Sequence, residues 1–239
     1  MYKINFDQPS TTYILSESAY QHERTCRGTF RKRTLLFPDL TNKESALTDH
    51  LEKAGAQIFY GQKASNIIDG IDVVVYTAAI HKDNEEYQAA VQKGLPMLTR
   101  AELLGQLMTN YDIPIAVSGT HGKTTTTSMI SHILLAGEMD PTISVGGILK
   151  AIGGNIRVGN SEIFVTEACE YTNSFLSFFP KISVILNIDE DHLDFFKDLE
   201  DIRNSFHRFA KLLPKDGTLV INGDIDRLDE ITGDLDCKS

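Results

Sequence analysis

The sequence predicts an α/β protein whose sheets are mainly parallel. The first observation is that short apolar runs alternate with helix-like segments from about residue 43 onward. The second is a glycine-rich turn that joins an apolar strand to a helix within residues 113–136. The third is size, because 239 residues, 41% of them hydrophobic, are enough for one large domain or two small ones.

The chain between residues 43 and 109 alternates helices and strands. We expect helices at Lys43–Ala54, Asn84–Lys93 and Ala101–Thr109, and strands at Ala56–Tyr60, Ile71–Tyr76 and, at a sheet edge, Pro96–Leu98. A polar break follows at Asn110-Tyr111-Asp112. We therefore place a domain boundary there, with domains at residues 1–109 and 110–239.

The second domain continues the same alternation. We expect strands at Ile113–Ser118, Ile163–Thr166, Ile182–Asn187 and Thr218–Asn222, and helices at Thr124–Ala136 and Asp198–Leu213. Gly137 is the expected C-cap of the first of these helices, and Pro214 closes the second.

Residues 10–42 depart from this pattern. They show little helical or strand periodicity, and they carry charged clusters at Gln21–Arg24 and Arg31-Lys32-Arg33. A first α/β domain should begin with a strand and a glycine-rich turn. No glycine precedes Gly28, so we interpret this segment as aberrant.

Charge and composition restrict the partners of the protein. Acidic residues number 33 against 23 basic ones, and the formal net charge of −10 disfavours nucleic acid and anionic membranes. No run approaches the ~20 apolar residues of a membrane helix, and residues 1–7 lack a signal-peptide core. Three scattered cysteines, at positions 26, 169 and 237, suit a reducing compartment. We expect a soluble cytoplasmic protein with a small anionic ligand and no membrane insertion.

The strongest chemical signal is Gly119-Thr120-His121-Gly122-Lys123-Thr124-Thr125, between an apolar strand and a helix. That setting is typical of a phosphate-binding loop, whose glycines let backbone N–H groups close around phosphate oxygens. Lys123 would reach the terminal phosphates, and the Thr124 hydroxyl can bind Mg²⁺. Val117 stands at the first glycine of the full G-x-x-x-x-G-K-[ST] pattern, so the match is partial. A chance strand–turn–helix junction is the alternative.

Acidic residues follow two other predicted strands of this domain. Glu167 comes directly after residues 163–166, and residues 189–194, which include His192, come after residues 182–187. The carboxyl ends of parallel strands share one edge, where α/β sheets bind their ligands. Glu167 and His192 are therefore candidates to hold Mg²⁺ beside ATP phosphates. Because histidine is an unusual Mg²⁺ ligand, a solvated acidic loop is an equal alternative.

Two basic residues are candidates for substrate contacts. Arg157 ends a glycine-rich stretch, residues 146–157, that can wrap an anionic substrate. A flexible loop is the simpler interpretation of that stretch. Arg100 opens the segment Arg100-Ala101-Glu102, which reads most simply as a helix start with a solvated first turn.

These residues together resemble the Mur ligases of peptidoglycan synthesis, in particular the members that join L-alanine to UDP-N-acetylmuramate. The matching segments are Arg100–Leu104, Gly119–Thr126, Gly153–Arg157, Glu167–Tyr171 and Asn187–Asp194, and the likeness covers residues 1–9 and about 43–236. The resemblance implies a Rossmann-like N-terminal domain that binds a UDP-sugar, residues 1–109. It implies that residues 110–239 are an incomplete P-loop-type central domain that binds ATP.

The resemblance also implies a reaction that uses ATP and Mg²⁺. The lactyl carboxylate of UDP-N-acetylmuramate attacks the γ-phosphate, and the amine of L-alanine then displaces phosphate from the acyl phosphate. Lys123 would stabilise the transferring phosphoryl group. Thr124 and Glu167 would hold one Mg²⁺, and His192 would hold a second. Arg100, Asn155 and Arg157 would contact the sugar nucleotide.

This chain departs from the family pattern in two places. Family members continue with the rest of the central domain and a third domain, which we expect to be absent from a chain that ends at Ser239; such a chain would be inactive alone. Residues 10–42 stand where the family has its first strand and a G-x-G-G loop for the diphosphate. We interpret them as a frame-shifted translation, because shifted frames of Thr11–Ala19, Tyr20–Arg27 and Thr34–Leu40 can encode family-like segments.

Two other functions remain open. A related ligase attaches recycled peptide to UDP-muramate and shares the phosphate loop, although residues 167–175 look more like the L-alanine enzyme. The other possibility is an inactive fragment that only binds nucleotide.

Overall fold

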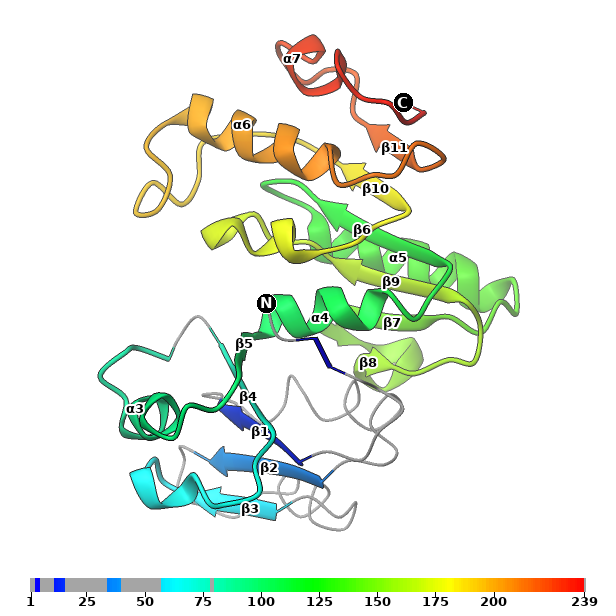
Figure 1. Ribbon diagram of the computed structural model, residues 1–239. Helices are drawn as coiled ribbons and strands as arrows, with labels where there is room; N and C mark the ends of the chain where they lie inside the picture. The colour runs from blue at the N-terminus through cyan, green and yellow to red at the C-terminus, as the bar shows by residue number, and fades with distance from the viewer. Residues whose placement is uncertain (1–2, 5–10, 16–33, 40–56, 78–79, 239) are drawn as a thin grey trace. The chain divides into compact units, whose positions relative to one another are not determined.

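The computed structural model describes residues 3–4, 11–15, 34–39, 57–77 and 80–238 (Figure 1). The chain divides into two compact units, Met1–Leu103 and Leu104–Ser239, and each has its own sheet. The division falls inside helix α4 (Arg100–Met108), a few residues before the polar break at 110–112. The predicted α/β class with mainly parallel sheets is confirmed.

The sheet of the first unit has five parallel strands in the order β3-β2-β1-β4-β5. This is the strand order found in doubly wound nucleotide-binding sheets. The strands are β1 (Thr11–Leu15), β2 (Thr34–Asp39), β3 (Gln57–Tyr60), β4 (Val73–Tyr76) and β5 (Met97–Thr99).

The expectation that residues 10–42 lack strand character is wrong for two runs in that segment. β1 lies in the middle of the sheet, between β2 and β4. The runs Thr-Thr-Tyr-Ile-Leu and Thr-Leu-Leu-Phe are rich in β-branched, aromatic and aliphatic residues, which favour strands even where charged clusters flank them. The predicted helix Lys43–Ala54 lies outside the described residues.

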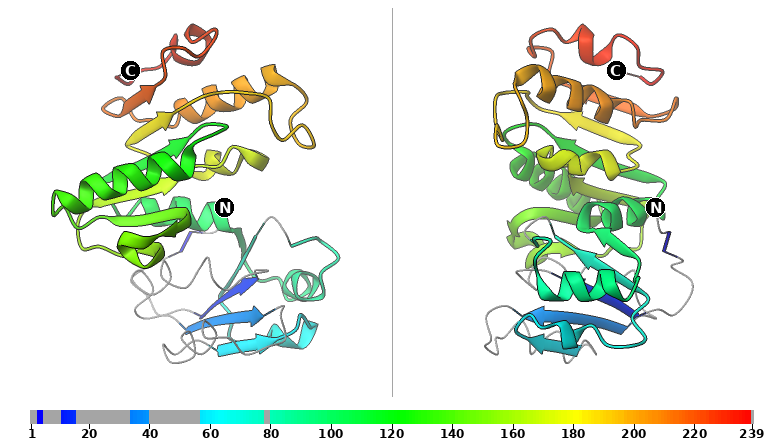
Figure 2. Two further views of the ribbon diagram at one scale, coloured as in Figure 1. Left: turned by 180° about the vertical axis from the view of Figure 1, so that it is seen from behind. Right: turned by 60° about the vertical axis from the view of Figure 1, so that its left-hand side comes forward.

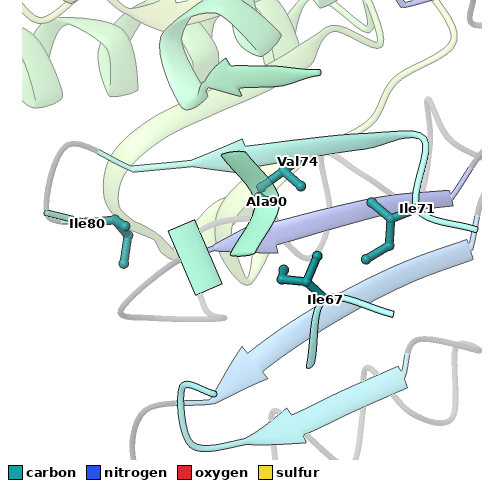
Figure 3. Packing of buried hydrophobic residues seen from close by; sticks show 5 residues of the cluster. All are labelled: Ile67, Ile71, Val74, Ile80 and Ala90. Carbon is teal, nitrogen blue, oxygen red and sulfur yellow. The ribbon is translucent and has the colours of Figure 1, made fainter. Parts of the chain in front are cut away.

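Helix α3 (Glu85–Gln92) covers part of this sheet, as predicted. Asn84 caps it, because its Oδ1 accepts hydrogen bonds from the backbone N–H groups of Glu86 and Tyr87, both at 3.0 Å. A short 3-10 helix, η2 (Ala64–Asn66), precedes β4. The apolar core of the unit gathers side chains from these elements and their connections: Ile67, Ile71, Val74, Ile80 and Ala90 (Figure 3).

The N-terminus of α4 is fixed by its own side chains. Glu102 accepts a hydrogen bond from the Thr99 backbone N–H at 2.7 Å, and its own N–H donates to the Thr99 hydroxyl at 3.1 Å. This reciprocal pair is a capping box. It confirms that Arg100-Ala101-Glu102 begins a helix.

The sheet of the second unit has six strands in the order β11-β10-β6-β9-β7-β8. Among these strands, β8 alone runs antiparallel to its neighbour. The strands are β6 (Ile113–Ser118), β7 (Thr142–Leu149), β8 (Gly154–Arg157), β9 (Ile163–Glu167), β10 (Ile182–Ile185) and β11 (Thr218–Ile221). Lys238 forms a single parallel bridge with Thr218 of β11.

The glycine-rich stretch is a hairpin, so its interpretation as a flexible loop is wrong. β7 and β8 pair through a short 3-10 turn, η3 (Lys150–Ile152). Ile143, Val145 and Ile156 are buried, and this apolar content favours strand pairing over a free loop. The register shifts between Ser144 and Leu149, where Gly146-Gly147 allow an irregular strand.

Helices cover both faces of this sheet. Helix α5 (Lys123–Ala136) lies on one face (Figure 2, left), where its Ile130 and Leu134 pack on Ile115, Ile163 and Val165. Helix α6 (Leu199–Ala210) and the 3-10 segment η4 (Tyr171–Ser177) lie on the other face (Figure 1). A short helix, α7 (Asp229–Thr232), follows β11. In the part of the chain that the structure describes, no helix combines the length and apolar character needed to cross a membrane.

We predict that Gly105→Ala destabilises the second unit. A Cβ at this position of α4 would stand 1.9 Å from the carbonyl oxygen of Ser177, a clash with backbone. Alanine normally stabilises a helix interior relative to glycine, but here overpacking should lower the free energy of unfolding by about 1–3 kcal/mol. Urea unfolding of the chain measures the change. Gly137→Ala is the control, since its nearest backbone contact would be 3.4 Å. Equal stability of the Gly105 variant and the wild type would refute the clash.

Candidate functional site

The predicted loop joins β6 to α5 at the carboxyl edge of the sheet. Gly119 has φ +142° and Gly122, the N-cap of α5, has φ +84°. A Cβ on Gly119 would also lie 2.9 Å from the Cβ of Leu186. Both positions therefore favour glycine, and the loop leaves the first N–H groups of α5 open to an anion.

The segment after β10 holds this loop in shape. The Thr120 hydroxyl accepts a hydrogen bond from the Asp189 backbone N–H at 2.9 Å. The Asn187 side chain accepts from the His121 N–H at 2.7 Å and donates to the His121 carbonyl at 3.0 Å. No role was expected for Asn187, although its place at the end of the predicted strand Ile182–Asn187 is a signal. These contacts hold the loop in its observed conformation.

Lys123 points back across the loop to a buried carboxylate. Its Nζ donates to the Gly119 carbonyl at 2.7 Å, the Thr120 carbonyl at 3.2 Å, and the Glu170 carboxylate at 2.8 Å. The side chain of Glu170 is only 2% exposed. Glu170 is not among the site residues that the sequence predicts. A second carboxylate three residues beyond Glu167, after the same strand, is the signal that could have found it.

Thr124 and Glu167, both predicted to hold metal, lie together at the loop. The Thr124 hydroxyl donates to Glu167 Oε2 at 3.0 Å, and the Gly146 N–H donates to the other carboxylate oxygen. A Cβ on Gly146 would lie 2.8 Å from Glu167 Oε2, so the glycine leaves room for the carboxylate. A hydroxyl and a carboxylate are hard oxygen donors, which fit Mg²⁺.

His192 lies beside Glu170. Its Nε2 is 3.9 Å from Glu170 Oε1, and its backbone has φ +53°. The Tyr171 ring packs against the imidazole in a tilted arrangement, with a centroid distance of 4.5 Å and an interplanar angle of 32°. The Tyr171 hydroxyl donates to Asp194 at 2.7 Å, and this bond raises the pKa of Tyr171. Thus the imidazole is packed against an aromatic ring and near one buried carboxylate.

The described residues contain no group of three or more His, Cys, Asp or Glu side chains arranged to hold a metal. Mg²⁺ commonly takes only one or two protein ligands and completes its shell with water and phosphate oxygens. The Thr124–Glu167 pair therefore fits an ion that arrives with a nucleotide better than a permanently bound metal.

The structure does not bring Arg157 to the loop. Arg157 pairs with Ile143 near the amino end of β7, whereas the loop lies at the carboxyl edge. Its guanidinium donates to the Pro141 carbonyl at 2.7 Å and forms an ion pair with Asp140. This pair lowers the pKa of Asp140 to about 2.

The remaining residues predicted to contact nucleotide or substrate lie in three different elements. Asn155 follows Gly154, which pairs with Leu149 at the carboxyl end of β7, on the same edge as the loop. Thr125 is exposed in the first turn of α5. Arg100 begins α4 in the first unit.

Two sequence profiles match the chain. The Mur ligase middle domain matches residues 117–238, and the domain described as Mur ligase family, catalytic domain, matches residues 41–112. The chain belongs to the Mur ligase family.

Curated relatives of this Mur ligase chain carry the name UDP-N-acetylmuramate–L-alanine ligase. The protein of Agathobacter rectalis is 55% identical over 248 aligned residues, which cover 100% of this chain and 52% of that protein. The protein of Lachnospira eligens is also 55% identical, over 238 residues, with the same coverage. The protein of Lachnoclostridium phytofermentans is 60% identical over 196 residues, which are 82% of this chain and 42% of that protein. The chain spans about half the length of the curated relatives it matches.

Solved structures of Mur ligases share its fold. The UDP-N-acetylmuramate–alanine ligase of Thermotoga maritima superposes with a TM-score of 0.76 at 27% identity, covering 93% of this chain and 50% of that one. A UDP-N-acetylmuramate:L-alanyl-gamma-D-glutamyl-meso-diaminopimelate ligase from Neisseria meningitides gives a TM-score of 0.84 at 24% identity, over 97% of this chain and 77% of that one. The second likeness concerns the fold alone.

Proposed function

We propose that this Mur ligase chain is the nucleotide-binding part of an enzyme that joins L-alanine to UDP-N-acetylmuramate at the expense of ATP. The observation that carries the proposal is the meeting of Lys123, Thr124 and Glu167 at the open N-terminus of α5. An ammonium group, a hydroxyl and a carboxylate at a glycine loop are the parts that phosphoryl transfer needs. The names of the relatives supply the substrates.

The loop residues divide the work of binding and activation. The N–H groups of residues 119–125 hold the phosphates, and Lys123 neutralises charge on the transferring phosphoryl group. Thr124 and Glu167 would hold Mg²⁺, and His192 would hold a second ion. Bound Mg²⁺ supplies neutralisation of the phosphate oxygens. The protein contributes position, because the carboxylate and the γ-phosphate must meet in line.

The proposal extends to the first unit and to the place of action. Residues 1–109, with an aberrant segment at residues 10–42, form the Rossmann-like UDP-sugar domain, and residues 110–239 form the incomplete ATP domain of a cytoplasmic enzyme. Arg100 and Asn155 contact the sugar nucleotide. Arg157, whose guanidinium pairs with Asp140 in this structure, is the third residue that contacts the sugar nucleotide.

A coupling assay tests this function in a ligase of family length that carries this sequence. We expect ADP and phosphate release only when UDP-N-acetylmuramate, L-alanine, ATP and Mg²⁺ are all present, with a product heavier by one alanine residue by mass spectrometry. Release that depends on the tripeptide L-Ala-γ-D-Glu-meso-diaminopimelate and ignores L-alanine would assign the peptide-recycling reaction instead. Release that needs no amine acceptor would refute both ligases.

A further inference from the structure

Glu170 lies between two side chains of the candidate site, Lys123 and His192. Its carboxylate accepts hydrogen bonds from Lys123 Nζ at 2.8 and 3.1 Å, and His192 Nε2 lies 3.9 Å from Oε1. We propose that Glu170 is a positioning residue that holds Lys123 across the loop before nucleotide binds and releases it to the incoming phosphate. The inference rests on the proposed function, since it takes the loop as the ATP site.

The number of hydrogen-bond donors on Lys123 explains why the lysine must change partners when phosphate binds. An ammonium group has three N–H donors. Those of Lys123 bond to three acceptor groups, the Gly119 carbonyl, the Thr120 carbonyl and the Glu170 carboxylate. A phosphate oxygen must replace at least one of them. The two carbonyls belong to the loop and move with the lysine, whereas Glu170 comes from the segment behind β9. The bond to Glu170 is therefore the one that breaks.

Burial gives this exchange an electrostatic cost. The Glu170 side chain is 2% exposed and that of Lys123 is 16% exposed, so the pair is shielded from water. A phosphate that takes Lys123 leaves a shielded carboxylate without its main partner and brings a second negative charge next to it. His192 is the remaining imidazole beside that carboxylate. In this arrangement the negative charge of Glu170 opposes anion binding. Its hydrogen bond also fixes the direction in which the Lys123 side chain crosses the loop.

The sign of the effect separates this role from the alternatives. When the charge of Glu170 is removed, Lys123 can bind phosphate without leaving a buried carboxylate unpaired. Phosphate should therefore bind more tightly. A residue that only supports the fold would weaken binding when it is changed, and so would a residue that binds the ligand or its metal.

Calorimetry with inorganic tripolyphosphate in EDTA tests the inference on the 239-residue chain. Tripolyphosphate probes the loop without adenine or sugar contacts, and EDTA removes the metal. We expect Glu170→Gln to lower the Kd about tenfold, and Lys123→Met to abolish binding in both backgrounds. Glu200→Gln is the matched control, because Glu200 is also paired, with Arg227 at 2.8 Å, but is 62% exposed. Its Kd should equal that of the wild type.

An unchanged or higher Kd in a folded Glu170→Gln variant would overturn the inference while leaving the nucleotide site in place. If the wild type shows no binding that depends on Lys123, the nucleotide site itself fails and the inference falls with it. If Glu170→Gln does not fold, Glu170→Asp retracts the carboxylate by one methylene and keeps its charge. The Kd of that variant must then be lower than that of the wild type, and an equal or higher value overturns the inference.

Discussion

Replacement of Lys123 by methionine is expected to lower ligation by at least about 10³-fold in a ligase of family length that carries this sequence. In the proposed reaction the lysine is the cation that faces the transferring phosphoryl group, and groups of this kind supply rate factors of that order. Phosphate release at saturating ATP measures the loss. Lys181→Met is the control, since Lys181 forms its ion pair with Asp216 at the amino end of β10, away from the loop. Turnover within tenfold of the wild type would exclude this role for Lys123.

The same substitution should also cost stability, for a reason that is independent of catalysis. It leaves the carboxylate of Glu170 buried without its lysine, and an orphaned buried charge costs about 3 kcal/mol or more. The double variant Lys123→Met/Glu170→Gln should recover most of the free energy of unfolding and none of the activity. Recovery of activity in the double variant would show that the defect was one of folding.

Glu167→Gln is expected to raise the Mg²⁺ concentration needed for half-maximal ligation by about 10–100-fold. The substitution keeps an acceptor for Thr124 but removes the negative charge that attracts the ion, and losses of this size are typical even for residues one shell further from a metal. A Mg²⁺ titration of phosphate release measures the shift.

Two further variants bracket this prediction. Gly146→Ala should shift the Mg²⁺ titration in the same direction. Its Cβ would lie 2.8 Å from Glu167 Oε2 and would displace the intact carboxylate. Glu162→Gln removes an exposed carboxylate at the amino end of the same strand and should have no effect. Coincident titrations of the Glu167 variant and the wild type would remove Glu167 from the metal site.

Most of the fold could be predicted because its signals are local. Ile113–Ser118 reads as a strand from its own apolar run, and the structure has β6 at the same residues. Asn84 marks a helix start because its side chain bonds to N–H groups two and three residues ahead. The phosphate loop is readable for the same reason, since two glycines, a lysine and a threonine stand within six residues between a strand and a helix.

The glycine-rich hairpin could not be recognised in this way. Gly146-Gly147 and Gly153-Gly154 are typical of loops when their neighbours in the chain are the only context. Gly146-Gly147 lie in β7 and Gly154 lies in β8 because Ile143, Val145 and Ile156 are buried in the second unit, and because Gly146 must leave room for Glu167, 21 residues away. Their conformation depends on partners that the chain reaches only after it folds.

The partners of the candidate site residues depend on tertiary structure most of all. Residue types and strand ends alone place Lys123, Thr124, Glu167 and His192 as candidates. Lys123 and Glu170 are 47 residues apart in the sequence, and the hydrogen-bonded residues Asn187 and His121 are 66 residues apart. Both contacts follow from the register of β6 between β9 and β10, where Val117 lies opposite Glu167 and Ser118 opposite Ile185. Sequence periodicity shows which face of a strand is apolar, but the neighbour of each strand is set by packing of the whole sheet.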